Sequence, residues 1–305
     1  MFEGSVSLRL YPHNDLPATE VVAELRAQAA LAAEFGFDGV MVSEHHGGFA
    51  GYLPNPIQTA GFLLDAMAAP AWAAPCPLLL PLRPAPLVVE EIAWLAARFP
   101  GRVGVGLAAG GLTDDFVRLG VPHDDLTRRF ADGLRVVAAA LSGRDGATVD
   151  GDPAVVRCRE HPVPVLSAAM GFTAVRRAAA NDVGLLFDSL STPERIRELT
   201  DAYRAAGGTR SCVLVRRAWV GPPPGDLFDA QVDVYRSYSP AKAQARWKGD
   251  QVLGDADAVA DAAGRAGCDA VDLRIHVPGV SPSAAREQIA ALGETVVTAL
   301  RSRLA

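Results

Sequence analysis

The stretch that decides the fold is EFGFDGVMVSEHHGGF, residues 34–49. Gly36 fits the end of a helix, and residues 39–43 form a short apolar run that is typical of a buried strand. Glu44, His45 and His46 therefore follow at the point where this strand ends. In an α/β barrel that end of a strand opens into the active site.

Outward from this stretch, short apolar runs alternate with amphipathic runs along the whole chain. The apolar runs predict strands at 6–10, 39–43, 78–80, 103–107, 163–167, 184–187, 211–220 and 270–275. The amphipathic runs predict helices at 19–35, 57–68, 87–99, 124–141, 173–181, 193–206, 256–266 and 282–304. The strands are apolar throughout rather than alternating, as in a parallel sheet that is covered on both faces.

Eight strands with helices between them, in about 250 residues plus insertions, predict a TIM (β/α)8 barrel. We expect it to occupy residues 1–305 as one domain, with an insertion at about 222–248 that forms a lid. A doubly wound sheet is the competing architecture. The segment from Gly104 to Gly106 lacks the G-x-G-x-x-G spacing that such a sheet uses for dinucleotides, so we prefer the barrel.

Composition excludes several classes of function. The net charge of −6 and the pI near 5.5 argue against a nucleic-acid partner, because no basic stripe is present to neutralise phosphates. The most apolar stretch, 66–82, contains four prolines and does not resemble a membrane span, and the first residues do not resemble a secretory signal. The four cysteines are far apart, which is typical of reduced thiols and leads us to expect a cytoplasmic protein.

The pair His45 and His46 is the first candidate for chemistry. Successive side chains of a strand point to opposite faces, so only one of the two can easily face the barrel mouth. Imidazole titrates near neutral pH, which suits proton transfer or the binding of an anionic ring. The alternatives are a histidine that only bonds a neighbouring carbonyl, or a zinc ligand, although the H-E-x-x-H spacing is absent. His13 follows the first strand and is either a substrate contact or a surface residue.

Other candidates come from the loops after later strands. Gly106 ends the fourth strand, where a glycine lets the backbone approach a flat ligand. Asp115 precedes Phe116 and is expected to face inward, whereas Asp114 is expected to face solvent.

Two further segments carry candidate residues. Cys76 and Pro77 stand at the start of the expected third strand, where the motif alone favours a trans proline at an edge. The turn through Gly171 and Phe172 leads into a helix whose free N–H groups could hold a phosphate, with Arg128 or the neighbouring arginine as countercharge. A plain capped helix with surface arginines is the alternative.

Together these segments resemble the luciferase-like flavin-dependent oxidoreductases, which include bacterial luciferase and the deazaflavin-dependent reductases. The resemblance covers nearly the whole chain. It runs through residues 36–40 and 44–46, then through 55–56, 80–83, 90–91, 101–106 and 115–120, with weaker similarity at 162–167, 254–267 and in the last helix.

The resemblance implies a TIM barrel with the coenzyme ring at its C-terminal mouth. It implies His45 as proton donor or acceptor, with Glu44 beside it in the coenzyme site and Asp115 as a second acid or positioning group. It also implies a cis bond at Cys76–Pro77 that supports the ring, phosphate contacts from Arg128 and the turn at Gly171, and a homodimer.

The chain also departs from the family pattern. Ala108 and Ala109 stand where bacterial luciferase has a cysteine and a phosphate-binding arginine. The choice between FMN and the deazaflavin coenzyme F420 stays open, and the missing arginine favours the deazaflavin.

The resulting hypothesis is an oxidoreductase or monooxygenase that acts on a small organic substrate by hydride transfer or oxygen insertion, without a metal. A flavin reductase is the partner expected if reduced flavin must be supplied. A flavin-storing protein of the same fold is the first alternative. The second is a metal-dependent hydrolase that uses His45, His46 and Asp115.

Overall fold

The protein, described here from a computed structural model, is a barrel of parallel strands. The structure describes residues 1–144, 149, 151–239, 241–244 and 252–300. The strands are β1 (Val6–Leu10), β2 (Gly39–Val42), β3 (Trp72–Pro75), β4 (Leu78–Leu79), β5 (Val105–Ala108), β6 (Val165–Ala168), β7 (Gly184–Leu186), β8 (Cys212–Arg217) and β9 (Ala270–Arg274). They form one sheet in the order β3-β2-β1-β9-β8-β7-β6-β5-β4, and every pairing is parallel.

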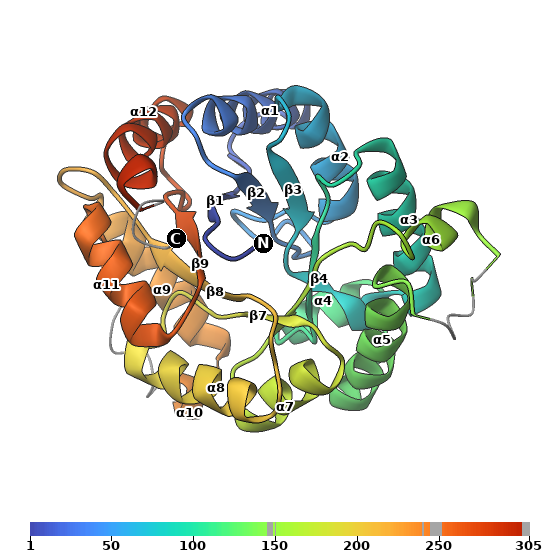
Figure 1. The fold of residues 1–305 in the computed structure, drawn as a ribbon. Coiled ribbons are helices and arrows are strands. Elements are labelled where there is room, and N and C mark those ends of the chain that lie inside the picture. The colour runs from blue at the N-terminus through green and yellow to red at the C-terminus, as the bar shows by residue number, and fades with distance from the viewer. Residues whose placement is uncertain (145–148, 150, 240, 245–251, 301–305) are drawn as a thin grey trace.

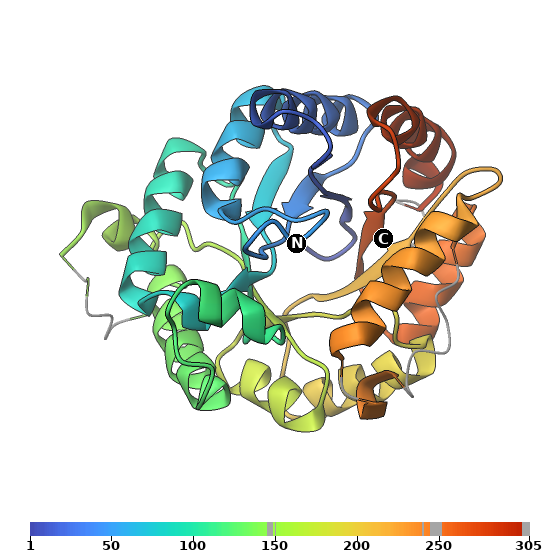
Figure 2. The ribbon, with the colours of Figure 1, turned by 180° about the vertical axis from the view of Figure 1, so that it is seen from behind.

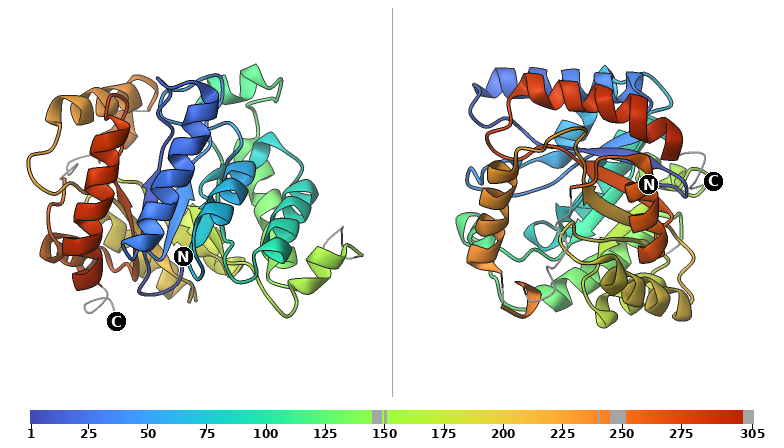
Figure 3. Two further views of the ribbon diagram at one scale, coloured as in Figure 1. Left: turned by 90° about the horizontal axis from the view of Figure 1, so that it is seen from above. Right: turned by 90° about the vertical axis from the view of Figure 1, so that its left-hand side faces the viewer.

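Helices surround this sheet in a ring (Figure 1). They are α1 (Ala18–Glu34), α2 (Pro56–Ala66), α3 (Ala85–Arg98), α4 (Thr113–Arg118), α5 (Leu126–Leu141), α6 (Pro153–Arg157), α7 (Phe172–Ala180), α8 (Pro193–Ala205), α9 (Gly225–Tyr238), α10 (Ala241–Gln244), α11 (Ala256–Ala266) and α12 (Pro282–Leu292). A π-helical turn, Gly293–Val297, extends α12. The last helix packs against α1, so the ring closes on itself (Figure 3). Within the described ranges, no helix combines the length and the apolar character needed to cross a membrane.

The barrel closes at the third strand, which is interrupted. β3 and β4 lie on either side of Cys76–Pro77, and this peptide bond is cis. Ala73 in β3 bridges to Val103 just before β5, and β4 pairs with β5 itself. The two segments therefore act as one strand, and the predicted eight-stranded TIM barrel is confirmed.

The predicted boundaries of the third strand were wrong. The strand begins at Trp72 rather than at residue 78, and Cys76–Pro77 lies in its middle rather than at its start. Prolines at 75 and 77 hid the first half, because an interrupted strand has no continuous apolar run. The cis bond agrees with the family resemblance and not with the trans proline that the isolated motif favoured.

Four helices were not predicted. α4 and α6 are single short turns of 6 and 5 residues, too short for a periodic pattern to reveal. α9 and α10 fill most of the predicted insertion, of which residues 240 and 245–248 lie outside the described residues. The view from behind shows α9 in orange and α4 in green on the same side of the barrel, the side of the strand C-termini (Figure 2).

The barrel is packed by pairing small residues on one strand with large side chains on the next. The interior is lined by Met41, Trp72, Leu166 and Val213 among others, and a second core fills the space between strands and helices. At Gly106 a β-carbon would lie 2.1 Å from Cys76 Sγ and 3.2 Å from the Cys76 α-carbon. The face of Gly106 that a side chain would occupy is therefore already filled by Cys76.

Gly106→Ala should lower the free energy of unfolding by about 1–3 kcal/mol, because the methyl group overpacks the space that Cys76 holds. Gly111→Ala is the matched control, since Gly111 is exposed with nothing within 4 Å of its β-carbon position, and should change stability by less than about 0.5 kcal/mol. Urea unfolding of both variants measures the difference. Cys76→Ala in the Gly106→Ala background should recover part of the loss, and an unchanged loss would contradict this packing argument.

Candidate active site

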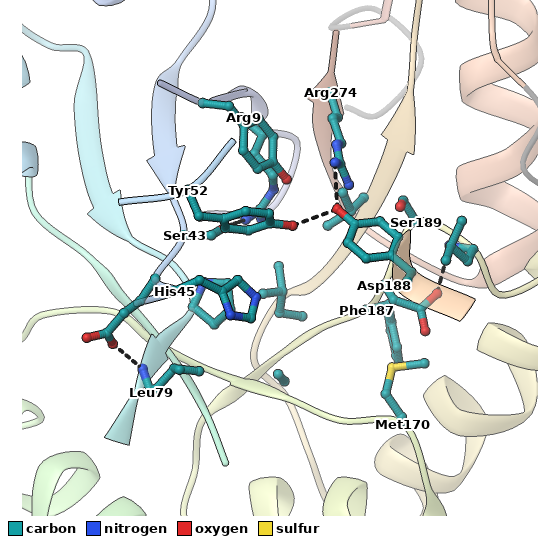
Figure 4. Close-up of a pocket in the computed structure, with 18 of the residues that line it drawn as sticks. Arg9, Ser43, His45, Tyr52, Leu79, Met170, Phe187, Asp188, Ser189 and Arg274 are labelled. Carbon is teal, nitrogen blue, oxygen red and sulfur yellow. Dashed lines mark hydrogen bonds between the residues drawn. The ribbon is translucent and has the colours of Figure 1, made fainter. Parts of the chain in front are cut away.

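A cavity of about 290 Å³ opens at the C-terminal end of the barrel. Its polar lining includes Arg9, Ser43, His45, Tyr52, Asp188 and Arg274, and its apolar lining includes Leu79, Met170, Leu186, Phe187 and Val215 (Figure 4). These residues come from strand ends and from the loops that follow them, as the barrel architecture predicts.

His45 and Asp115, the two residues predicted to be catalytic, are in direct contact. Asp115 lies in the first turn of α4 and is fully buried. Its carboxylate accepts a hydrogen bond from His45 Nδ1 at 2.7 Å and another from the backbone N–H of His46 at 2.8 Å. Because a carboxylate accepts, Nδ1 carries the proton, and the lone pair of Nε2 is left to accept a proton.

Two aromatic rings hold the imidazole of His45 in place. Phe49 lies with its ring centroid 4.7 Å away, and the ring of Tyr52 meets the imidazole edge to face at 4.4 Å. The side chain of His45 is only 17% exposed and belongs to the cavity lining. The arrangement can therefore move a proton at Nε2 in a site from which water is mostly excluded.

Glu44 also lines the cavity, but its carboxylate and the imidazole of His46 bond to groups other than the Asp115 carboxylate. The carboxylate of Glu44 accepts hydrogen bonds from the backbone N–H of Leu79 at 2.6 Å and from Arg83 at 2.6 Å. His46 Nε2 lies 2.9 Å from the same carboxylate. Glu44 thus joins the end of β2 to β4, and the two imidazoles bond to different carboxylates.

The alternative of a metal-dependent hydrolase requires His45, His46 and Asp115 to meet at one metal ion. His45, His46 and Asp115 do not converge on one point, and the described residues contain no group of three or more metal-ligating side chains that could hold an ion.

A polar network that the sequence analysis missed lies at the floor of the cavity. Arg9 in β1 donates from Nε to Asp272 in β9 at 2.6 Å, and from Nη1 to Ser43 Oγ and to the carbonyl of Cys76, both at 2.6 Å. This network connects four neighbouring parts of the barrel. The available signal was a charged residue within a short, mostly apolar strand, which occurs at Arg9 in β1 and at Asp272 and Arg274 in β9.

A second missed cluster combines Arg274, Tyr235 and Tyr52. Arg274 ends β9, Tyr235 belongs to α9, and Tyr52 lies in the loop after β2. Arg274 Nη2 donates to the Tyr235 hydroxyl at 2.7 Å, and the two tyrosine hydroxyls are 2.7 Å apart (Figure 4). The predicted insertion therefore contributes a wall of the cavity, because Tyr235 and Ser239 both line it.

The structure brings Pro77 to the cavity and keeps Cys76 beneath it. Pro77 lines the cavity, and its carbonyl accepts from the backbone N–H of Glu44 at 3.1 Å. Cys76 is buried, and burial raises the pKa of its thiol to about 12, so that the group stays protonated. Gly106 contacts Cys76 and does not line the cavity.

Three residues predicted to bind a coenzyme phosphate also lie outside the cavity lining. Arg128 is exposed at the start of α5, where its guanidinium donates to Asp125 at 3.0 Å. Gly171 is the residue before α7, and Phe172 is 43% exposed with the guanidinium of Arg195 above its ring. Their role as a phosphate site stays a prediction.

His13, predicted as a substrate contact or a surface residue, is buried away from the cavity. Its Nδ1 lies 3.1 Å from the carbonyl of Val280, and its Nε2 lies 2.8 Å from the amide nitrogen of Gln28. Its ring meets that of His276 edge to face at 4.4 Å. Burial is the main cause that lowers the pKa of both histidines, and that of His276 falls to about 3.

Asp115→Asn should reverse the tautomer of His45. The asparagine oxygen can still accept from the His46 N–H, so its NH₂ group is left to donate to His45 Nδ1 and moves the imidazole proton to Nε2. The ¹⁵N shifts of the labelled imidazole, recorded above the pH at which histidines titrate, measure the change. Asp114→Asn is the control, because Asp114 is exposed and pairs only with Arg118, and it should leave the tautomer unchanged.

The buried His276 should make stability fall as the pH is lowered. A histidine with an ordinary pKa in the unfolded chain binds a proton below about pH 6.5, whereas folded His276 resists protonation until about pH 3. Lowering the pH from 7 to 5 should therefore cost about 2 kcal/mol of unfolding free energy from this group. His276→Gln should remove that part of the slope, whereas His161→Gln, at an exposed site, should keep it. Denaturant unfolding at both pH values would refute the assignment if all three proteins gave the same slope.

Comparison with known proteins is consistent with this arrangement. A family model described as luciferase-like monooxygenase matches residues 6–299. An F420-dependent glucose-6-phosphate dehydrogenase from Microbacterium testaceum is 29% identical over 210 residues, which cover 62% of this chain and 61% of that protein. The match thus spans less than two thirds of the relative's length.

Solved structures share the fold at lower identity. The oxygenating constituent of 3,6-diketocamphane monooxygenase from Pseudomonas putida, solved in complex with FMN, superposes with a TM-score of 0.76 at 15% identity over 98% of this chain and 99% of that one. The coenzyme F420 dependent tetrahydromethanopterin reductase from Methanopyrus kandleri gives a TM-score of 0.72 at 15% identity, again over 98% and 99% of the two chains. Because the family model matches nearly the whole chain, from the first strand to the last helix, the chain belongs to the luciferase-like monooxygenase family.

Proposed function

We propose that the chain is an oxidoreductase that uses a flavin-type coenzyme, and that it prefers the deazaflavin F420 to FMN. The observation that carries the proposal is the pair of His45 and Asp115 in the cavity of a family member. Two features support the deazaflavin. The relative with 29% identity is an F420-dependent enzyme, and Ala109 replaces the arginine expected for an FMN phosphate by resemblance to bacterial luciferase.

The cavity suits a flat ring with polar edges. Its walls are apolar at Leu79, Leu186 and Val215, which suits the faces of such a ring. Arg274, at its edge, has a buried Nε without a hydrogen-bond partner in the described part of the chain, and this donor fits a ring carbonyl or another ligand oxygen. The volume of about 290 Å³ is at the low end of the roughly 300–1,000 Å³ of ligand cavities, which favours a ring rather than a whole coenzyme.

The chain's own residues would carry the proton part of the reaction. The coenzyme, when bound, supplies hydride acceptance or, for FMN, oxygen chemistry. His45 Nε2 accepts the proton of a substrate hydroxyl. A hydride leaves the carbon that bears this hydroxyl and passes to the coenzyme, so that an alcohol becomes a carbonyl compound. Asp115 stabilises the positive charge that forms on the imidazole, and Phe49 and Tyr52 keep water away from it.

The alternative reaction, the partner, the substrate, the oligomeric state and the location are also part of the proposal. Oxygen insertion with FMN is the alternative reaction, and a flavin reductase would then be the partner. Under either reaction we expect a small organic substrate, a homodimer, a cytoplasmic location and a lid role for the insertion that carries Tyr235. A storage protein would bind the coenzyme without turnover.

His45→Ala should lower turnover at least about 100-fold and leave the coenzyme dissociation constant within about threefold of the wild-type value. The reason is that the imidazole acts on the proton in the transition state and is one of many contacts to a ring. Absorbance titration with F420 and with FMN measures binding. Hydride transfer is followed by the loss of the visible deazaflavin band, with glucose 6-phosphate and a panel of small alcohols as donors.

His161→Ala is the control, because this histidine is exposed and is not among the residues that line the cavity. Unchanged turnover in His45→Ala would remove the residue from the mechanism. Tight FMN binding with no response to F420 would reverse the coenzyme preference. Binding without turnover of any donor, with or without oxygen, would favour the storage protein.

A further inference from the structure

Arg274 is a buried cation in the cavity lining that no carboxylate of the described residues neutralises. It is 4% exposed, and in the described part of the chain no carboxylate oxygen forms an ion pair with it. Its hydrogen bonds leave from Nη2 and go to the amide oxygen of Gln231 and the hydroxyl of Tyr235, both uncharged. The ring of Tyr11 lies 4.6 Å from the guanidinium carbon.

The carboxylates nearest to this cluster are engaged elsewhere. Asp272, two residues earlier on the same strand, is paired with Arg9 at 2.6 Å. Glu44 is paired with Arg83 at 2.6 Å. Asp188 accepts from the backbone N–H groups of Leu190 and Ser191 in its own turn.

The amide oxygen of Gln231 is shared between two guanidinium groups. It accepts a hydrogen bond from Arg217 at 3.0 Å as well as the one from Arg274.

The phenols and the imidazole near Arg274 do not supply negative charge. Burial is the largest cause of the raised pKa values of Tyr11 and Tyr52, so both phenols stay neutral near pH 7. Burial, with His13 and Arg274, lowers the pKa of His276 to about 3, so this ring is neutral as well. The positive charge of Arg274 therefore remains.

A buried charge without a counter-ion is costly, and contact with an aromatic ring compensates only part of that cost. The guanidinium also keeps an unused donor, since Nε is buried without a hydrogen-bond partner among the described residues. We propose that Arg274 is the anchor for an anionic oxygen group, a carboxylate or phosphate, of the molecule that fills the cavity. The inference rests on the proposed function in assigning the ligand to the same site, and it requires that either the substrate or the coenzyme places an anionic oxygen group beside Arg274.

The group has two possible sources, the substrate or the coenzyme. Benzoate and benzamide are suitable probes, because they share size and shape and differ in charge. Titration calorimetry on the wild-type chain without coenzyme should show that benzoate binds at least about tenfold tighter than benzamide, as charge-assisted hydrogen bonds require. Arg274→Gln should bring the two affinities within about twofold, and Arg274→Lys should keep part of the preference for the anion.

Arg236→Gln is the matched control, since it removes an exposed arginine from the helix that carries Tyr235 and should keep the preference. The same titration on the coenzyme-loaded protein distinguishes the sources. Retained binding of benzoate assigns the anion to the substrate. Displacement of benzoate by the coenzyme, with coenzyme binding weakened about tenfold in Arg274→Gln, assigns it to the coenzyme.

Three results would overturn the inference: equal affinity of the wild-type chain for the two probes, binding of neither at millimolar concentration, or a preference that survives in Arg274→Gln. Should Arg274→Gln fail to fold, the wild-type comparison and Arg274→Lys still decide. A wild-type chain that binds neither FMN nor F420 would contradict the proposed function, but the comparison of probes without coenzyme would remain readable.

Discussion

The candidate site depends on one buried carboxylate, that of Asp115. A fully buried carboxylate is stable only when donors surround it, and here the imidazole of His45 and the backbone N–H of His46 both donate to it. The two bonds join α4 to the end of β2. They also select the tautomer in which His45 Nε2 can accept a proton. Position, tautomer and orientation of the histidine thus follow from the same pair of contacts.

Neighbouring residues at the end of β2 make different contacts because successive side chains of a strand point to opposite faces. His45 follows the inward positions Met41 and Ser43, and reaches the cavity. Glu44 points the other way, where its carboxylate joins β2 to β4 through the backbone of Leu79. From the residue types alone, the carboxylate of Glu44 and the imidazoles of His45 and His46 would be expected to lie together at the end of the second strand. The alternation separates His45, the proposed proton-transfer group, from Glu44, which makes a structural contact.

Much of the fold was predictable from the sequence because helices and buried parallel strands leave periodic patterns. The helix at 256–266 has the predicted bounds, and the first strand does as well. The third strand was misplaced because its proline interruption removes the pattern on which the prediction depends. α9 was missed for a related reason, since it follows a proline-rich turn and lies within the segment that the sequence predicts as a lid insertion.

The site was predictable to a smaller degree. His45 and Asp115 were identified individually, and their contact across 70 positions could not follow from spacing. Arg9, Tyr235 and Arg274 were missed because the sequence of one strand or helix does not show which of its polar side chains will reach a shared cavity. Only the closed barrel brings β1, β9 and α9 together around one cavity.

Arg9 and Arg274, buried on the neighbouring strands β1 and β9, differ in one respect that concerns function. Arg9 has an internal counter-ion, Asp272, and its remaining donors meet Ser43 and the Cys76 carbonyl, so it forms a neutral and saturated floor. Arg274 lies two positions beyond Asp272 on β9 and has only uncharged partners. A purely structural role would favour the first arrangement at both positions, because a saturated ion pair costs less to bury than a lone cation. Arg274 has the second arrangement at the cavity wall, where an incoming ligand can supply the missing charge.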